Sequence, residues 1–398
     1  MTDRAMARSY YSSSHLSLDY AIDQNSPNLF FVLCISSQLV RCLALCLQHS
    51  DRLDVFALTY ATSSNLLDMD PISQGVLGAS CAQSISRRRN LAPATVAGAL
   101  AGMAPDLDVL ISSTTDPLLF LEYHRHFTHA LAFIPVGALI CAIAFHWFLR
   151  HQLKFSFTYL ACLVGYASHG PLDACTTYGT LLFWPFSDTR VAWNNVSVVD
   201  PIFTVPVLVL GYYSFKRHSP ILGRCALGWA IGYLFLGLSQ THSAQAAGAE
   251  LAASRGHVPV RAQASPAIGN LWLWRHIYEY DGRIYADAIR VGFSDRVFEG
   301  SSLSKLNMSE FVRRLNQGST QAKDVDRFTK FADGYLGIAE DDENRIIDLR
   351  YSPLPNEVSG IWSIVIDPSA NDDAHVRFET DRGSEPGRVD LLFEMLFR

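Results

Sequence analysis

Apolar stretches of membrane-spanning length gather between residues 90 and 243, whereas the chain from about residue 250 onward mixes apolar and charged positions as soluble domains do. We therefore expect a mostly α, multi-helix transmembrane domain over residues 69–243, followed by a small soluble α+β domain over residues 255–398. The predicted helices of the first domain are Pro71–Ser86, Leu91–Met103, Ala130–Leu149, Phe155–Gly165, Pro201–Phe215 and Ile221–Leu238.

The C-terminal part alternates aromatic and polar residues in a pattern typical of strands. Strands are predicted near Leu271–Tyr280 and Arg283–Phe293, helices near Ser309–Leu315 and Ala322–Tyr335, and more strands follow up to about residue 379. The small, Ala-rich stretch Ala244–Ala253 is expected to be a hinge between the two domains.

Residues 1–68 form an N-terminal extension that we expect to be dispensable. Its one apolar run, Leu29–Leu47, contains Arg41, and an arginine near the centre of a span costs about 2.5–3.5 kcal/mol on insertion scales. Two interpretations stay open. The run is a poor spanning helix, or the gene start is assigned too early and translation begins at Met69, where Met69-Asp70-Pro71 resembles a natural start.

Charged residues in the connections predict the topology. The basic ones fall on every second connection, and the acidic ones fall on the others. The basic set is Arg87, Arg88, Arg89, Arg150, Lys154, Lys216, Arg217 and Arg224, and the acidic set is Asp106, Asp108, Asp116, Glu122, Asp173, Asp188 and Asp200. The positive-inside rule then places the acidic loops, and the C-terminal domain after them, on the non-cytoplasmic face of the membrane.

Composition excludes two classes of function. The net charge of −6 argues against nucleic acid as a partner, because phosphate backbones need a basic surface. The eight cysteines form no CxxC pair and none lies in the C-terminal domain, which argues against a disulfide framework or a zinc–thiolate site.

Three short motifs on the predicted outer face carry the candidate chemistry: PDLD, HRHFTH and HGPLD. They place six metal-ligating side chains beside spanning segments, namely Asp106, Asp108, His124, His129, His169 and Asp173. Each of these residues alone has an ordinary structural explanation, such as a helix end or an interfacial histidine. Ionisable groups at membrane depth, however, are costly and usually functional. Histidine and carboxylate together suit zinc, with manganese or iron as alternatives. The sequence therefore predicts one shared divalent-metal site.

The chain resembles the YdjM-type family of inner-membrane metal-dependent hydrolases. The resemblance runs from about Met69 to Phe215 and is carried by MDPISQGVLGA, GALAGMAPDLDVL, HRHFTHA, GYASHGPLDACTTYGTLLFWPFSD and NNVSVVDPIFTVPVLV. It implies metal ligation by the six His and Asp residues and a multi-pass protein of the bacterial inner membrane. Gln74 and Gln83 depart from the family pattern, which more often has a histidine and a glutamate there.

The resulting hypothesis is a metal-dependent hydrolase that attacks an ester or phosphoester with a metal-activated water. Asp106, Asp108 or Asp173 would act as general base, and Arg125 would clamp an anionic group of the substrate. The position at the membrane face favours a membrane lipid or lipid-linked substrate. The alternative is a non-catalytic membrane protein in which the metal staples helices together while the C-terminal domain binds a partner. An open coordination position would separate the two, since structural sites are closed.

Overall fold

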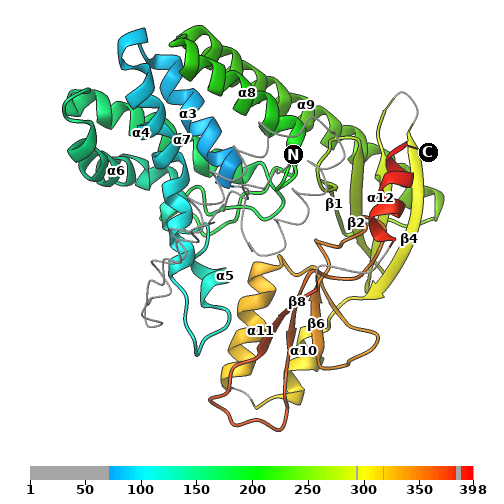
Figure 1. Ribbon diagram of the computed structural model, residues 1–398. Helices are drawn as coiled ribbons and strands as arrows, with labels where there is room; N and C mark the ends of the chain where they lie inside the picture. Colours follow the sequence, from blue (N-terminus) through cyan, green and yellow to red (C-terminus); the bar gives the residue numbers. More distant parts are fainter. Residues whose placement is uncertain (1–70, 293–294, 317, 382–386, 398) are drawn as a thin grey trace, which may run out of the picture. The chain divides into compact units, whose positions relative to one another are not determined.

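The computed structural model describes residues 71–292, 295–316, 318–381 and 387–397, so the predictions for residues 1–68 lie outside the described residues (Figure 1). A mostly helical part precedes a β-sheet part, as predicted. The α-helices of the first part are α3 (Pro71–Ile85), α4 (Leu91–Met103), α5 (Leu119–Tyr123), α6 (Ile134–Leu149), α7 (Phe155–Ala174), α8 (Pro201–Arg217) and α9 (Pro220–Ser254). Short 3₁₀ segments connect them: η2 (Arg88–Asn90), η3 (Ala104–Leu110), η4 (Phe127–His129) and η5 (Leu131–Phe133).

Glycines let α3, α4 and α7 pack backbone against backbone. A methyl group added at Gly78 would collide with the carbonyl of Gly98, and one added at Gly165 would collide with that same residue. Small residues at such crossings are typical of helices that pack within membranes. The close approach brings the end of α4, where η3 begins, beside the last turns of α7. The PDLD and HGPLD motifs therefore meet at one end of the helices.

Among the described residues, two helices are long and apolar enough to cross a membrane: Leu131–Leu149 and Pro220–Ser254. The first lies within the predicted helix Ala130–Leu149, and the second contains the predicted helix Ile221–Leu238. Both expose large apolar side chains, including Ile143 and Phe148 on α6 and Phe235 on α9. The shorter α8 does not meet the same criterion of length and hydropathy.

The C-terminal part contains two antiparallel four-stranded sheets, each a meander in chain order. The first comprises β1 (Arg261–Pro266), β2 (Leu273–Tyr280), β3 (Arg283–Arg290) and β4 (Arg296–Ser304), and the second comprises β5 (Leu336–Ile338), β6 (Arg345–Asp348), β7 (Trp362–Val365) and β8 (Arg377–Thr380). Three α-helices and one 3₁₀ turn accompany them: α10 (Met308–Phe311), η6 (Val312–Arg314), α11 (Thr320–Phe331) and α12 (Arg388–Phe397). Asp281 and Gly282 both have positive φ, which suits the two-residue hairpin between β2 and β3.

The predicted hinge at Ala244–Ala253 is wrong, because these residues are the last turns of the continuous helix α9. Alanine is the strongest helix former, so an Ala-rich stretch extends a helix that is already nucleated. Figure 1 shows α9 passing from α8 to the sheet β1–β4. Gly248 lets the sheet pack closely, since a methyl group there would collide with the ring of His276 on β2.

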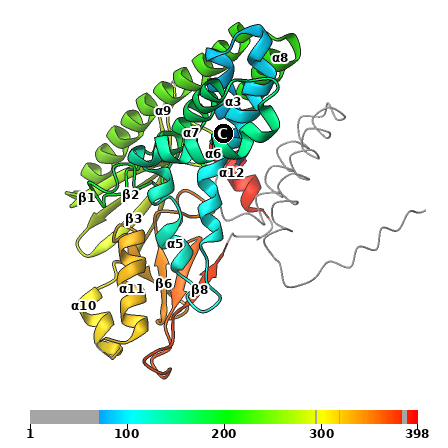
Figure 2. The same cartoon turned by 90° about the vertical axis from the view of Figure 1, so that its left-hand side faces the viewer.

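Helix α11 packs against the second sheet, as Figure 2 shows, and its apolar face meets residues from the helical part. Leu118, Leu121 and Tyr178 belong to the same buried cluster as Phe328 and Phe331. This shared core places the C-terminal part against the loops that carry the predicted motifs.

Candidate functional site

All six His and Asp residues predicted from the motifs lie in one network of contacts. Four of them offer donor atoms that lie within 4.8 Å of one another: Asp106, His129, His169 and Asp173. We call these four the donor cluster. The side chains of three are completely buried, and that of Asp106 is 15% exposed, so the cluster reaches solvent through Asp106. Asp108 and His124 lie one layer behind it.

The 3₁₀ geometry of η3 explains why two carboxylates two positions apart take different places. Residues i and i+2 of a 3₁₀ helix point about 240° apart, since each turn contains about three residues. Asp106 Oδ1 accordingly lies 3.4 Å from His129 Nε2 and 3.2 Å from His169 Nε2. Asp108 Oδ2 instead lies 3.2 Å from Nδ1 of His129, on the other side of that ring.

The HGPLD motif forms the last turns of α7, and Pro171 does not interrupt them. His169 and Asp173 therefore face the same side at i, i+4 spacing, with His169 Nε2 3.6 Å from Asp173 Oδ2. Proline has no backbone N–H, so Pro171 removes one hydrogen bond of the helix. The loss falls in the last turn, because α7 ends at Ala174.

The outer contacts of both histidines direct their lone pairs into the cluster. His169 Nδ1 lies against the carbonyl oxygen of Gly102 and must donate to it. His129 Nδ1 lies against the carboxylate of Asp108, which favours a proton on that nitrogen. In the neutral tautomers both Nε2 atoms then carry lone pairs, yet they lie only 2.9 Å apart. A cation between them would remove this repulsion.

The buried carboxylate of Asp108 holds the HRHFTH loop in place. Its carboxylate accepts hydrogen bonds from the backbone N–H of Arg125 and the hydroxyl of Thr128, and it pairs with the rings of His124 and His129. Burial alone would raise the pKa of Asp108, but these hydrogen bonds and the two histidines outweigh it and hold that pKa well below its usual range. Asp108 is thus a fixed anion that orients the loop.

Arg125 is buried, and its guanidinium faces the donor cluster. Its Nε lies 3.1 Å from Asp173 Oδ2, and one terminal nitrogen donates to Thr176. Its backbone has a φ of 61°, an uncommon conformation that costs on the order of 1–3 kcal/mol for a residue other than glycine. The turn directs His124 toward Asp108 and Arg125 toward Asp173. The role of Arg125 as a substrate clamp stays a prediction.

The two departures from the family pattern differ in position. Gln74 is buried on α3 and donates from Nε2 to Asp173 Oδ1, while its Oε1 lacks a hydrogen-bond partner. Gln83 bonds the carbonyl of Gly211 and lies outside the donor cluster.

The charges of the site fit a divalent cation. Asp106, Asp108 and Asp173 provide three carboxylates, and Arg125 provides one guanidinium, which leaves two negative charges uncompensated if the histidines are neutral. Asp173 Oδ2 is also buried, and although Arg125 Nε lies 3.1 Å away, the two atoms form no well-aligned hydrogen bond. Uncompensated buried charge is expensive, so the residues present favour metal binding.

A second group of ligand-type residues escaped the sequence analysis: Asp116, Asp324 and His375. Arg327 on α11 pairs with Asp116 and Asp324, and also with Glu122, so these acids already have a cationic partner within the chain. The group connects the loop before α5 to the C-terminal part. Asp116 lies more than 200 residues before Asp324, and His375 lies 51 residues after Asp324, so no local motif marks the group.

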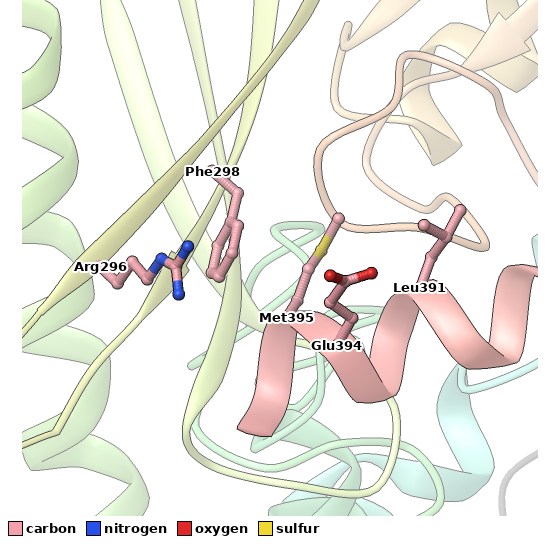
Figure 3. A pocket seen from close by; sticks show the side chains of 5 residues that line it. All are labelled: Arg296, Phe298, Leu391, Glu394 and Met395. Carbon is pink, nitrogen blue, oxygen red and sulfur yellow. The ribbon is translucent and has the colours of Figure 1, made fainter. Parts of the chain in front are cut away.

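A cavity of about 280 Å³ lies between β4 and α12 (Figure 3). Its lining comprises Arg296, Phe298, Leu391, Glu394 and Met395. None of the predicted site residues lines it, so it does not extend the donor cluster.

The family model that matches this chain covers its helical part. Residues 69–244 match the family model described as YdjM inner membrane protein. The chain is 31% identical over 147 residues to the inner membrane protein YbcI of Escherichia coli (strain K12), an alignment that covers 36% of this chain and 80% of that protein. No solved structure matches the chain. The donor cluster lies within the matched region, and the chain belongs to the YdjM inner membrane protein family.

Proposed function

We propose that this protein is a membrane-bound metal-dependent hydrolase that cleaves an ester or phosphoester. The observation that carries the proposal is the convergence of four donor atoms from Asp106, His129, His169 and Asp173, with both imidazole Nε2 atoms facing inward. A bound divalent metal, zinc in the first instance, would lower the pKa of a water toward neutrality and so supply a hydroxide nucleophile.

The residues of the chain divide the remaining work by position. Asp106 is the carboxylate of the cluster that reaches solvent, so it is placed to accept a proton from an incoming water. Asp108 orients His129, and His124 supports Asp108 from the other side. Arg125 holds Asp173 and balances part of the negative charge.

The proposal includes a multi-pass arrangement with the site at the non-cytoplasmic membrane face. The candidate span Leu131–Leu149 begins two residues after His129, and the backbone N–H of Leu131 donates to the carbonyl of Leu182, which precedes the exposed side chain of Phe183. Aromatic residues of this kind favour the interface between lipid and water. A lipid or lipid-linked ester is the substrate that this position favours.

The test uses full-length protein purified in detergent and loaded with zinc, manganese or iron. We expect one metal ion per chain and turnover of a chromogenic phosphodiester or carboxylic ester. His169→Ala and Asp173→Ala should lose both metal and turnover, whereas His146→Ala, a histidine on α6 that bonds Thr158, should keep them. A wild-type protein without bound metal would overturn the proposal.

A structural metal site is the second candidate, favoured by the near-complete burial of four protein donors, which matches closed zinc sites. Cobalt substitution separates the two candidates. An absorption spectrum that changes on adding azide indicates an open position and supports catalysis, and an unchanged spectrum supports the structural role.

A further inference from the structure

Three arginine side chains meet beside the donor cluster, where the helical part contacts the C-terminal part. Arg125 and Arg190 lie 4.4 and 5.5 Å from the centroid of the Tyr178 ring. Arg190 and Arg350 lie 6.0 and 5.0 Å from the centroid of the Phe331 ring. The two rings are themselves 5.2 Å apart. They therefore hold three guanidinium groups around one junction.

Two of the three arginines pair with a carboxylate. Arg125 pairs with Asp173, and Arg350 pairs with Asp348 at 2.7 Å. In the part of the chain that the structure describes, no carboxylate lies within ion-pair distance of Arg190. One positive charge at the junction therefore lacks a carboxylate counter-ion, although its side chain is partly removed from water, where such a charge is costly.

Arg190 retains capacity for a ligand. It donates to the backbone oxygens of Leu121, His124 and Gly179, which uses three of the five N–H donors of a guanidinium. These contacts fix its position without neutralising its charge. Its side chain is partly exposed, so an anion can approach it from solvent.

Tyr351, which follows Arg350 in the chain, adds a hydroxyl to the same place. Its oxygen is buried and has no hydrogen-bond partner. Burial raises the pKa of Tyr351, which keeps its hydroxyl protonated. The guanidinium of Arg350 lies 5.5 Å from the centroid of the Tyr351 ring. That ring packs 4.6 Å from Trp362, which contacts Tyr178.

We propose that Arg190 and Tyr351, backed by Arg125 and Arg350, form a subsite for the phosphate group of the substrate. Arginine matches the geometry of phosphate oxygens, and the subsite adjoins the donor cluster through the contact of Arg125 with Asp173. The inference rests on the proposed function and narrows its substrate class to phosphate esters. It also gives the C-terminal domain a part in substrate binding.

The test measures binding of inorganic phosphate to the full chain in detergent by isothermal titration calorimetry, with and without zinc. We expect Arg190→Gln to weaken binding about tenfold or more and Tyr351→Phe to weaken it less, with metal content unchanged. The matched control is Arg314→Gln, because Arg314 also donates to a backbone carbonyl and lies over an aromatic ring but pairs with Glu343. It should bind phosphate like the wild type.

Unchanged phosphate affinity in both Arg190→Gln and Tyr351→Phe overturns the subsite, as does a wild type that binds no phosphate at millimolar concentration. Phosphate binding that depends on Arg190 in zinc-free protein supports the subsite even if the protein shows no turnover. The failure of the hydrolase proposal can therefore be told apart from the failure of the subsite. Displacement of phosphate by glycerol 3-phosphate identifies a water-soluble ester, and displacement by phosphatidic acid in micelles alone identifies a lipid headgroup. Displacement by neither contradicts the proposal.

Discussion

His129 Nδ1 lies 3.2 Å from Asp108 Oδ2, while Nε2 of the same ring faces Asp106 and Asp173. One imidazole therefore connects a buried anion to the donor cluster. A carboxylate behind a metal-binding histidine fixes the ring tautomer and raises the basicity of the facing nitrogen.

Asp108→Asn should weaken metal binding about 10–100-fold, because the amide keeps the shape of the side chain and loses the charge that orients His129. Competition titration with a chromophoric chelator measures the affinity. Asp188→Asn, on an exposed loop residue, is the control and should bind metal like the wild type. Equal affinity of Asp108→Asn and the wild type would show that Asp108 does not support the site.

Gly248→Ala should destabilise the protein by about 1–3 kcal/mol, because the added methyl group would collide with the ring of His276 and overpack the contact between α9 and β2. Gly232→Ala on the same helix is the matched control, since nothing lies within 4 Å of its added methyl group. It should stabilise the helix by about 0.5–1 kcal/mol. Chemical denaturation in detergent measures both, and equal effects would refute the close packing.

His276 should make the stability of the C-terminal domain depend on pH. Burial lowers the pKa of His276 to about 4, whereas the unfolded chain has the ordinary value of 6.5. Between these values the unfolded chain binds a proton that the folded chain excludes. The free energy of unfolding is therefore unaffected by protonation of His276 above pH 6.5. As the pH decreases from 6.5 toward 4 it falls, by about 3 kcal/mol in all.

Thermal unfolding of the wild type and His276→Leu, followed by tryptophan fluorescence at pH 7.5 and pH 5, tests this effect. Carboxylates titrate in both proteins, so the difference between them reports His276. The wild type should lose more stability on acidification than the variant. Parallel losses would exclude His276 as the cause.

A reporter enzyme that is active only outside the cytoplasm should be active when fused after about residue 260 and inactive when fused at Arg88 or Lys216. The expectation follows from the segregation of basic and acidic connections in the helical part. The inverse pattern would place the donor cluster and the C-terminal domain in the cytoplasm.

The sequence by itself predicted most helices of the first part, the two strands β2 and β3, and the residue types of the candidate site. It did not predict α5, and α7 and α9 continue beyond their predicted ends, to Ala174 and Ser254. The successful predictions depend on local patterns: apolar stretches, alternating aromatic residues and three short motifs. The same local reasoning placed a hinge in α9, because composition does not reveal that an Ala-rich stretch continues an existing helix.

Only the tertiary structure decided how the six predicted residues divide between the donor cluster and the layer behind it. Asp106 and Asp108 are equivalent in the motif, and the turn of η3 separates them. The partners Gln74, Arg190 and Arg350 reach the site from distant positions in the chain. Their places depend on the packing of α3, α7 and the C-terminal part, and such long-range contacts leave no periodic signal in the sequence.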